Sequence, residues 1–187
     1  MDVLELVRRR RSVKAFTDEP VKRDLLESLI EAAVWAPNHK LTEPWLFYVL
    51  GADTKGRFAE LRRDLRTKKL PNAESAEAQA TLRKLLEDTI ATPALVAVSC
   101  AVSDDPVRRD EDYAATAMAV QNLLIAAWSL GLGSYLRTGE ILEHPEARAL
   151  LGVPDDHRLF GVISLGRPAG VPEKRRTPAR EKTRWLP

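Results

Sequence analysis

Two stretches decide the fold: RRRRSVKAF, residues Arg8 to Phe16, and APNHKLTEPWLFYVL, residues Ala36 to Leu50. The first concentrates guanidinium groups, a serine hydroxyl and a lysine at a predicted junction between helix and loop. Fixed positive charge and donors at this density suit a phosphomonoester. A simpler interpretation is the solvated end of a helix, where the dipole favours positive charge. In the second stretch, a helix is expected to stop at Pro37, and an exposed Asn-His-Lys turn precedes the apolar strand Trp45 to Leu50.

Apolar residues at helical spacing predict further helices around these stretches. The predicted helices are a short one around Leu4, Leu6 and Val7, one between Pro20 and Pro37, one capped by Asp53 with Phe58, Leu61 and Leu65 on its apolar stripe, and one from about Ala73 to Ile90. The long segment Asp112 to Leu130 has apolar residues nearly all round. Such a helix is expected to be buried on most sides, and this predicts an extensive homodimer interface.

Buried strands are predicted at Ala94 to Val102 and at Arg158 to Leu165, because both runs are rich in apolar residues. Glycines surround the segment Ser134 to Thr138. No internal repeat or low-complexity linker divides the sequence. Three or four strands interleaved with helices therefore predict one α+β sandwich, a single domain over residues 1–187.

The composition is typical of a compact domain with one sizeable core. The chain has 187 residues, of which 44% are hydrophobic, and a formal net charge of only +2. This balance argues against a surface designed for nucleic acid or anionic lipid. The single cysteine, Cys100, lies in an apolar run and is interpreted as a buried core residue of a protein in a reducing compartment. No stretch approaches membrane-spanning length, so we expect a cytoplasmic protein with no membrane partner.

Taken as an ordered pair, separated by one amphipathic helix, the two stretches resemble the opening of the FMN-dependent nitroreductase family. The HK turn before Pro44 and Trp45 resembles the YdjA-type branch of that family. The resemblance covers nearly the whole chain. It implies a nitroreductase-like α+β sandwich with a central, mainly antiparallel sheet, a long buried helix and a homodimeric assembly. It also implies FMN as cofactor and NADH or NADPH as electron donor.

The resemblance assigns flavin-binding roles to residues in both stretches. Arg10, Arg11 and Ser12 occupy the positions of the family's RRS motif, which belongs to the FMN-binding set. Lys14 lies outside that match and would reach the phosphate only if the loop curls. The family's turn, here with Pro37 and His39, crosses the dimer interface to a flavin bound mainly by the opposite subunit.

The turn departs from the family pattern at two positions. Asn38 stands where the branch commonly has Asp, and Glu43 stands where the family has Gln. These differences leave open the ring-edge contacts and the substrate range. Trp45 is interpreted as a core anchor rather than a flavin-stacking residue. His144 and His157 are interpreted as structural or surface residues.

A third motif, GLGSYLRTG, follows the long apolar segment. By position, Leu136, Arg137 and Thr138 correspond to the branch's flavin-contacting triplet, with leucine in place of the usual aromatic residue. Arg137 is the candidate for stabilising negative charge near N1 and the C2 carbonyl of the flavin, and no other catalytic residue is assigned. In the tail, Arg176 of PEKRR corresponds to the late basic residues that complete the phosphate site, although a solvated tail is the alternative.

The resemblance implies transfer of two electrons from NAD(P)H to a nitroaromatic, a quinone or a similar small acceptor by a ping-pong mechanism. Other flavin chemistry on the same scaffold, such as dehalogenation or heterocycle oxidation, remains an alternative. A non-enzymatic nucleic-acid-binding domain is a second alternative, disfavoured by the balanced charge. The motifs contain no metal cluster and no Ser-His-Asp arrangement.

Overall fold

A computed structural model of the protein describes residues 2–187. Its centre is a four-stranded sheet in the order β1-β2-β4-β3, and every neighbouring pair is antiparallel. The strands are β1 (Trp45–Val49), β2 (Ala94–Ala101), β3 (Gly133–Arg137) and β4 (His157–Gly166). The inner strands β2 and β4 are almost wholly buried, which explains their continuous apolar sequence. The predicted mainly antiparallel sheet is confirmed.

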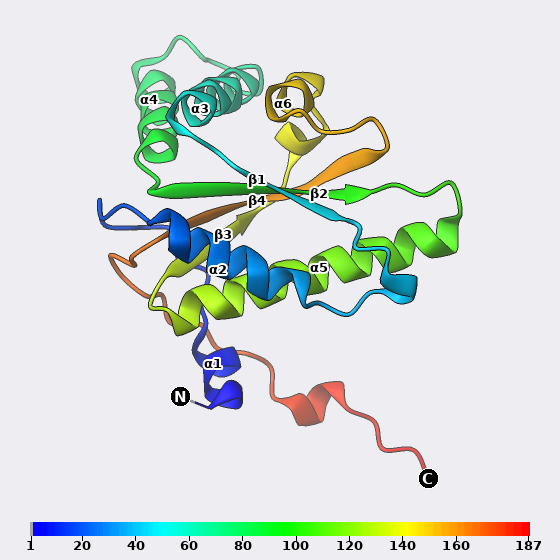
Figure 1. Ribbon diagram of the computed structural model, residues 1–187. Helices are drawn as coiled ribbons and strands as arrows, with labels where there is room; N and C mark the ends of the chain where they lie inside the picture. Colours follow the sequence, from blue (N-terminus) through cyan, green and yellow to red (C-terminus); the bar gives the residue numbers. More distant parts are fainter. Residues whose placement is uncertain (1) are drawn as a thin grey trace.

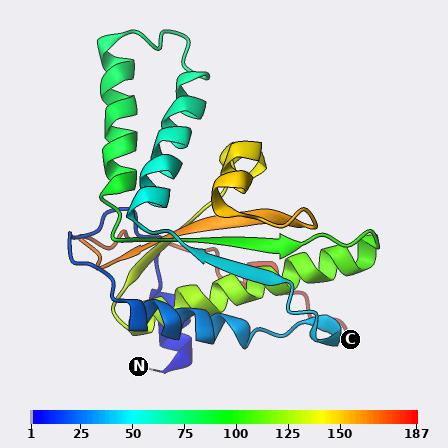
Figure 2. The ribbon, with the colours of Figure 1, turned by 45° about the horizontal axis from the view of Figure 1, so that its top comes forward.

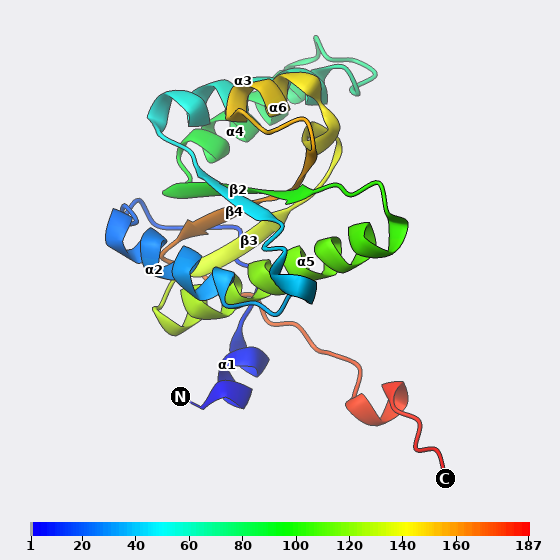
Figure 3. The same ribbon diagram turned by 45° about the vertical axis from the view of Figure 1, so that its right-hand side comes forward.

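Helices cover both faces of the sheet (Figures 1 and 3). One face carries α2 (Arg23–Val34) and the long helix α5 (Pro106–Ser129). The other face carries α3 (Ala52–Thr67), α4 (Ala76–Ile90) and α6 (Pro145–Leu151). Each face has its own hydrophobic cluster against the sheet. The prediction of an α+β sandwich is therefore confirmed.

Three parts of the chain extend from this body. Helices α3 and α4 pair as a hairpin that projects from one face of the sheet, as Figure 2 shows. The short helix α1 (Val3–Arg9) and the C-terminal tail extend on the other side (Figure 1). The tail contains only one short 3-10 helix, Ala179–Lys182, and residues 171–187 are exposed. Two further 3-10 helices, His39–Leu41 and Glu140–Glu143, connect larger elements. Of the helices described, none is both long and apolar enough to span a membrane.

Two details of the predicted helices were wrong. Helix α5 begins at Pro106, with Asp105 as its N-cap, so it starts six residues before the predicted Asp112. Its first turns are charged and exposed, and the apolar pattern therefore did not reveal them. The N-cap of α3 is Gly51, whereas Asp53 lies inside the first turn, where a carboxylate still suits the helix dipole.

Helix α5 buries the side that faces the sheet and α2, including Ala119 and Leu123. Away from that side, Val107, Tyr113 and Met118 of α5 are large apolar residues that stay exposed, as does the C-cap residue Leu130. The predicted burial of Trp45 and Cys100 is confirmed, because both side chains lie in the cluster on the α5 face.

Candidate functional site

The basic N-terminal segment docks against β3, an edge strand of the sheet. The backbone N–H of Val13 donates to the carbonyl oxygen of Ser134 at 2.9 Å, and Ser12 forms an isolated parallel bridge with Ser134. Val13 is fully buried on Gly133, where an added β-carbon would lie 2.9 Å from the Val13 Cβ. Glycine at position 133 therefore permits the close approach that places Arg10 and Ser12 beside the sheet edge.

Arg10 lies in a cluster of positive charge. Partial burial, followed by the positive charges of Arg176 and Arg11, lowers the pKa of Arg10. Throughout residues 2–187, no carboxylate forms a salt bridge with Arg10 or Arg176. The tail thus brings a late arginine to the N-terminal motif, and the cluster fits an external phosphate.

Arg11 makes contacts of a different kind. Its Nη1 atom donates to the carbonyl oxygens of Arg8 at 2.6 Å and of Arg10 at 2.9 Å. The Arg11 side chain therefore satisfies carbonyl groups at the end of α1, in the manner of the helix-end interpretation. Ser12 keeps an exposed side chain.

The end of β3 forms the second part of the site. The cations of Lys14 and Arg137 lie over the Tyr135 ring, 5.0 Å and 4.9 Å from its centroid. Arg137 also donates through Nε to the Ser164 hydroxyl at 3.2 Å. Lys14 lies outside the sequence motif, but in the structure its side chain contacts Tyr135 of β3, as Arg137 does.

Leu136 and Thr138 flank Arg137 at the rim of a pocket. Leu136 packs over Gly161, where an added β-carbon would lie 2.6 Å from the Leu136 Cδ1 atom. Thr138 is exposed. The predicted triplet Leu136–Thr138 thus lines one pocket, and part of the Leu136 side chain packs into the core.

The Pro37–His39 turn is tied to the beginning of α5. Nδ1 of His39 lies 2.6 Å from Oε2 of Glu111, and the Thr42 hydroxyl donates to Oδ1 of buried Asp112 at 2.6 Å. Pro37 and His39 themselves are exposed. The turn is held by contacts from its side chains, and its outer surface stays open.

The backbone of this turn is strained. Lys40, Leu41 and Glu43 have φ angles of 56°, 52° and 44°, in the left-handed region that non-glycine residues rarely adopt. The side-chain amide oxygen of Asn38 accepts the N–H of Glu43 at 2.9 Å and helps to hold this shape. Strain of this kind often accompanies function.

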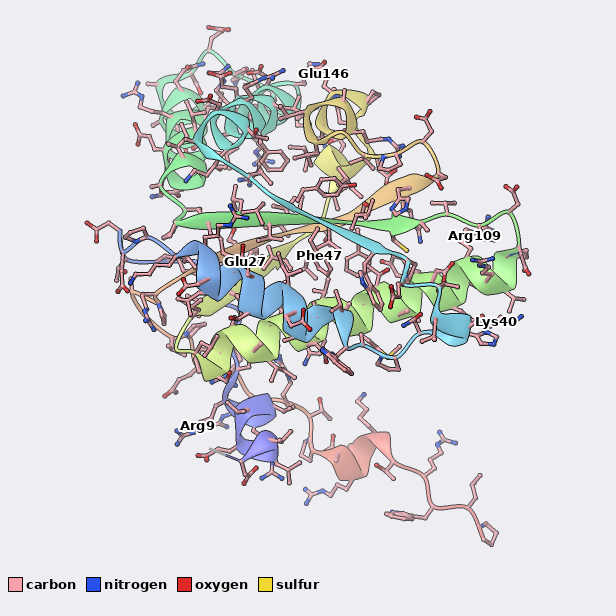
Figure 4. The ribbon with its side chains drawn as sticks, in the orientation of Figure 1. Arg9, Glu27, Lys40, Phe47, Arg109 and Glu146 are labelled. Carbon is pink, nitrogen blue, oxygen red and sulfur yellow. The ribbon has the colours of Figure 1, made fainter. Side chains whose placement is uncertain are left out.

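The turn and the basic cluster lie far apart within one chain. Figure 4 shows Lys40 of the turn and Arg9 of α1 on different sides of the molecule. The turn contacts Glu111 near the start of α5, whereas the basic segment pairs with Ser134, beyond the end of that helix. At about 1.5 Å per residue, the helix from Glu111 to Ser129 is about 27 Å long.

A residue that sequence reasoning missed lies beside Arg137. Arg62 of α3 lines the same pocket, and its Nη1 atom donates to the Thr89 hydroxyl at 2.6 Å. The available signal was positional, because Arg62 follows Phe58 by four residues and therefore shares the apolar side of α3. No cluster of three or more metal-ligating side chains occurs among residues 2–187.

Known proteins resemble this chain over most of its length. A model described as the nitroreductase family matches residues 7–167. The Bacillus subtilis (strain 168) protein "Putative NAD(P)H nitroreductase YfhC" is 32% identical over 180 residues, covering 95% of this chain and 91% of that protein. A solved nitroreductase-like family protein from Bacillus cereus is 31% identical, with a TM-score of 0.83 and coverage of 100% and 96%. A nitroreductase with bound FMN from Bacteroides fragilis NCTC 9343 is 27% identical, with a TM-score of 0.75 and coverage of 100% of both chains.

The antiparallel sandwich, with a basic cluster at one sheet edge, defines a nitroreductase-like fold. The chain belongs to the nitroreductase family and is an oxidoreductase. The family predicted from the N-terminal motifs is therefore confirmed.

Proposed function

We propose that residues 1–187 form one FMN-binding domain that transfers two electrons from NADH or NADPH to a small acceptor, such as a nitroaromatic or a quinone. The observation that carries this proposal is the cluster of Arg10 and Arg176, which has no salt bridge to a carboxylate within residues 2–187 and lies beside a sheet edge. The FMN-bound relative and the name of YfhC support the choice of cofactor and donor. Bound FMN would supply the two-electron chemistry between donor and acceptor.

The residues of this chain would bind and orient the cofactor. Arg10, Ser12 and Arg176 would hold the phosphate, because guanidinium and hydroxyl donors match its oxygens. Arg137, held in place by Ser164, would stabilise negative charge near N1 and the C2 carbonyl. Arg11 is kept in the proposed binding set only through its charge, because its side chain already binds backbone carbonyls.

We further propose a homodimer in which Pro37 and His39 of one subunit approach the flavin held by Arg10 of the other. Two observations support this arrangement. The turn is too distant to reach the basic cluster of its own chain, and large apolar side chains are exposed on α1, α5 and the tail, including Trp185 at 92%. Burying such residues between subunits would remove apolar area from water.

One site used in turn by donor and acceptor would give ping-pong kinetics. The test begins with purified protein, which should be yellow and should release FMN on heating. Stopped-flow mixing with NADH or NADPH alone should abolish the yellow absorbance, and later addition of a quinone or a nitroaromatic should restore it. If neither nicotinamide changes a bound flavin, the proposed donor is wrong. Release of nucleic acid instead of FMN would favour the nucleic-acid-binding alternative. Cytoplasmic location stays a prediction.

A further inference from the structure

The pocket beside Arg137 contains a second arginine, Arg62, that the proposed function does not use. It has a volume of about 190 Å³ and lies between α3, β3, β4 and the 3-10 helix Glu140–Glu143. Phe58, Leu142 and Val162 form its apolar walls, and its charged lining residues are two arginines, Arg62 and Arg137. None of its nine lining residues is acidic.

Each guanidinium in this pocket is held by a neutral hydroxyl group. Arg62 donates to Thr89 at 2.6 Å, and Arg137 donates to Ser164 at 3.2 Å. Within the part of the chain that the structure describes, neither arginine forms a salt bridge. A guanidinium has five N–H donors, so both side chains are positioned while most of their donors remain for another partner.

The arrangement is costly for the protein alone. Burial, followed by the positive charge of Arg137, lowers the pKa of Arg62 from its ordinary value to about 10. Arg62 still carries its charge at neutral pH, so two like charges face one small pocket. An anion bound there would relieve both the repulsion and the loss of hydration.

We propose that Arg62 and Arg137 form a subsite for the carboxylate of a small, mainly apolar molecule. A carboxylate matches the planar donor fork of a guanidinium, and the Phe58, Leu142 and Val162 walls would contact the apolar body. The volume is below the roughly 300–1,000 Å³ of drug-sized ligand sites, which favours a compact ligand such as a substituted benzoate.

The subsite also indicates a class of acceptor, and this step rests on the proposed function. Leu136, Arg137 and Thr138 line the pocket and are the triplet proposed to contact the flavin. A carboxylate held by Arg62 would therefore lie next to the reacting region. The structure favours aromatic acceptors that carry a carboxylate over neutral acceptors of the same shape.

The test uses the FMN-loaded protein and an Arg62→Gln variant. Benzoate binding is measured by calorimetry, with benzamide as the neutral probe. Reduction of 4-nitrobenzoate is compared with reduction of 4-nitrobenzamide. We expect Arg62→Gln to lose about 10- to 100-fold in benzoate affinity and in kcat/KM for 4-nitrobenzoate, because one charge-assisted contact is removed. The affinity for benzamide and kcat/KM for 4-nitrobenzamide should change little in this variant.

The matched control is Arg57→Gln, which removes the same charge from an exposed position on α3, outside this pocket. Arg57→Gln should leave unchanged the affinities for benzoate and benzamide and kcat/KM for 4-nitrobenzoate and 4-nitrobenzamide. Arg62→Lys keeps the charge without the planar fork, should lose less than Arg62→Gln, and serves in its place if Arg62→Gln does not fold.

Three results would overturn the subsite: unchanged benzoate affinity in Arg62→Gln, equal losses for nitrobenzoate and nitrobenzamide, or reduced FMN affinity in that variant. The last would assign Arg62 to the flavin instead. If benzoate binds through Arg62 while no acceptor is reduced, the anion subsite stands and the proposed function fails.

Discussion

Nδ1 of His39 lies 2.6 Å from Oε2 of Glu111, although 72 residues separate them in sequence. Both side chains are about half exposed, so this contact contributes little to global stability, on the order of 1 kcal/mol or less. Its consequence is positional. It holds the strained turn against the start of α5, away from the basic cluster on β3 of the same chain.

The first prediction tests whether Arg10 and His39 serve one flavin from opposite subunits. Each alanine variant, Arg10→Ala or His39→Ala, should impair both sites of its homodimer. In a heterodimer of the two variant chains, one site receives both substitutions and the other receives neither. Half of the sites should therefore recover.

The measurement co-expresses differently tagged chains, isolates the heterodimer and compares tightly bound FMN and turnover with both homodimers. No recovery above the homodimer average would rule out the cross-subunit assignment. A normal His39→Ala homodimer would show that His39 is only an exposed turn residue.

The second prediction concerns Arg10 alone. Arg10→Ala should weaken FMN binding by about 10- to 100-fold, or about 1.5–3 kcal/mol, because a charge-assisted contact to phosphate is lost. The fold should persist, since Arg10 forms no salt bridge within residues 2–187. Flavin titration of the apoprotein measures the change. Arg9→Ala, which removes an exposed arginine paired with Glu5 on α1, is the control and should bind FMN normally. Equal affinity in both variants would exclude Arg10 from the site.

The third prediction concerns the contact that docks the basic segment. Gly133→Ala should destabilise the protein by about 1–3 kcal/mol, because the new β-carbon would lie 2.9 Å from the buried Val13 Cβ. Displacing Val13 should also reduce FMN affinity. Denaturant unfolding and flavin titration measure the two effects. Gly170→Ala is the control, because nothing lies within 4 Å of its added β-carbon. An unaffected Gly133→Ala variant would show that the segment tolerates a wider separation.

The fourth prediction concerns pH and His157. Its Nδ1 lies 3.0 Å from the Ser99 hydroxyl. Burial lowers the pKa of His157 below 6.5; the carboxylate of Asp156 opposes this effect in part, and the positive charge of Arg148 adds a smaller lowering. Between the lowered folded pKa and 6.5, the unfolded chain binds more protons than the native state. The stability that neutral His157 contributes is therefore complete above about pH 6.5 and decreases as the pH falls.

Unfolding free energies of wild type and His157→Asn, measured from pH 8 to pH 5, test this prediction. The difference between the two proteins should stay constant above about pH 6.5 and shift against wild type below it. A difference independent of pH would show that His157 titrates alike in both states.

Local sequence determined much of this protein. The basic run, the turn after Pro37 and the apolar periodicities each depend on neighbouring residues, and together they predicted the family, the sandwich and most helices. Local sequence failed to locate two helix starts. Charged residues at the beginning of α5 hid its first turns, and Gly51 rather than Asp53 is the N-cap of α3.

Only the tertiary structure showed which residues distant in sequence lie in contact. The order β1-β2-β4-β3 makes β3 an edge strand, and at that open edge Val13 packs onto Gly133. The same packing brings Arg62 of α3 to Arg137, 75 positions later by the sequence numbering (137 − 62), although neither position signals the other. Side chains distant in sequence come together only after the strands and helices pack. The basic cluster at the sheet edge and the two-arginine pocket could therefore be located only in the folded chain.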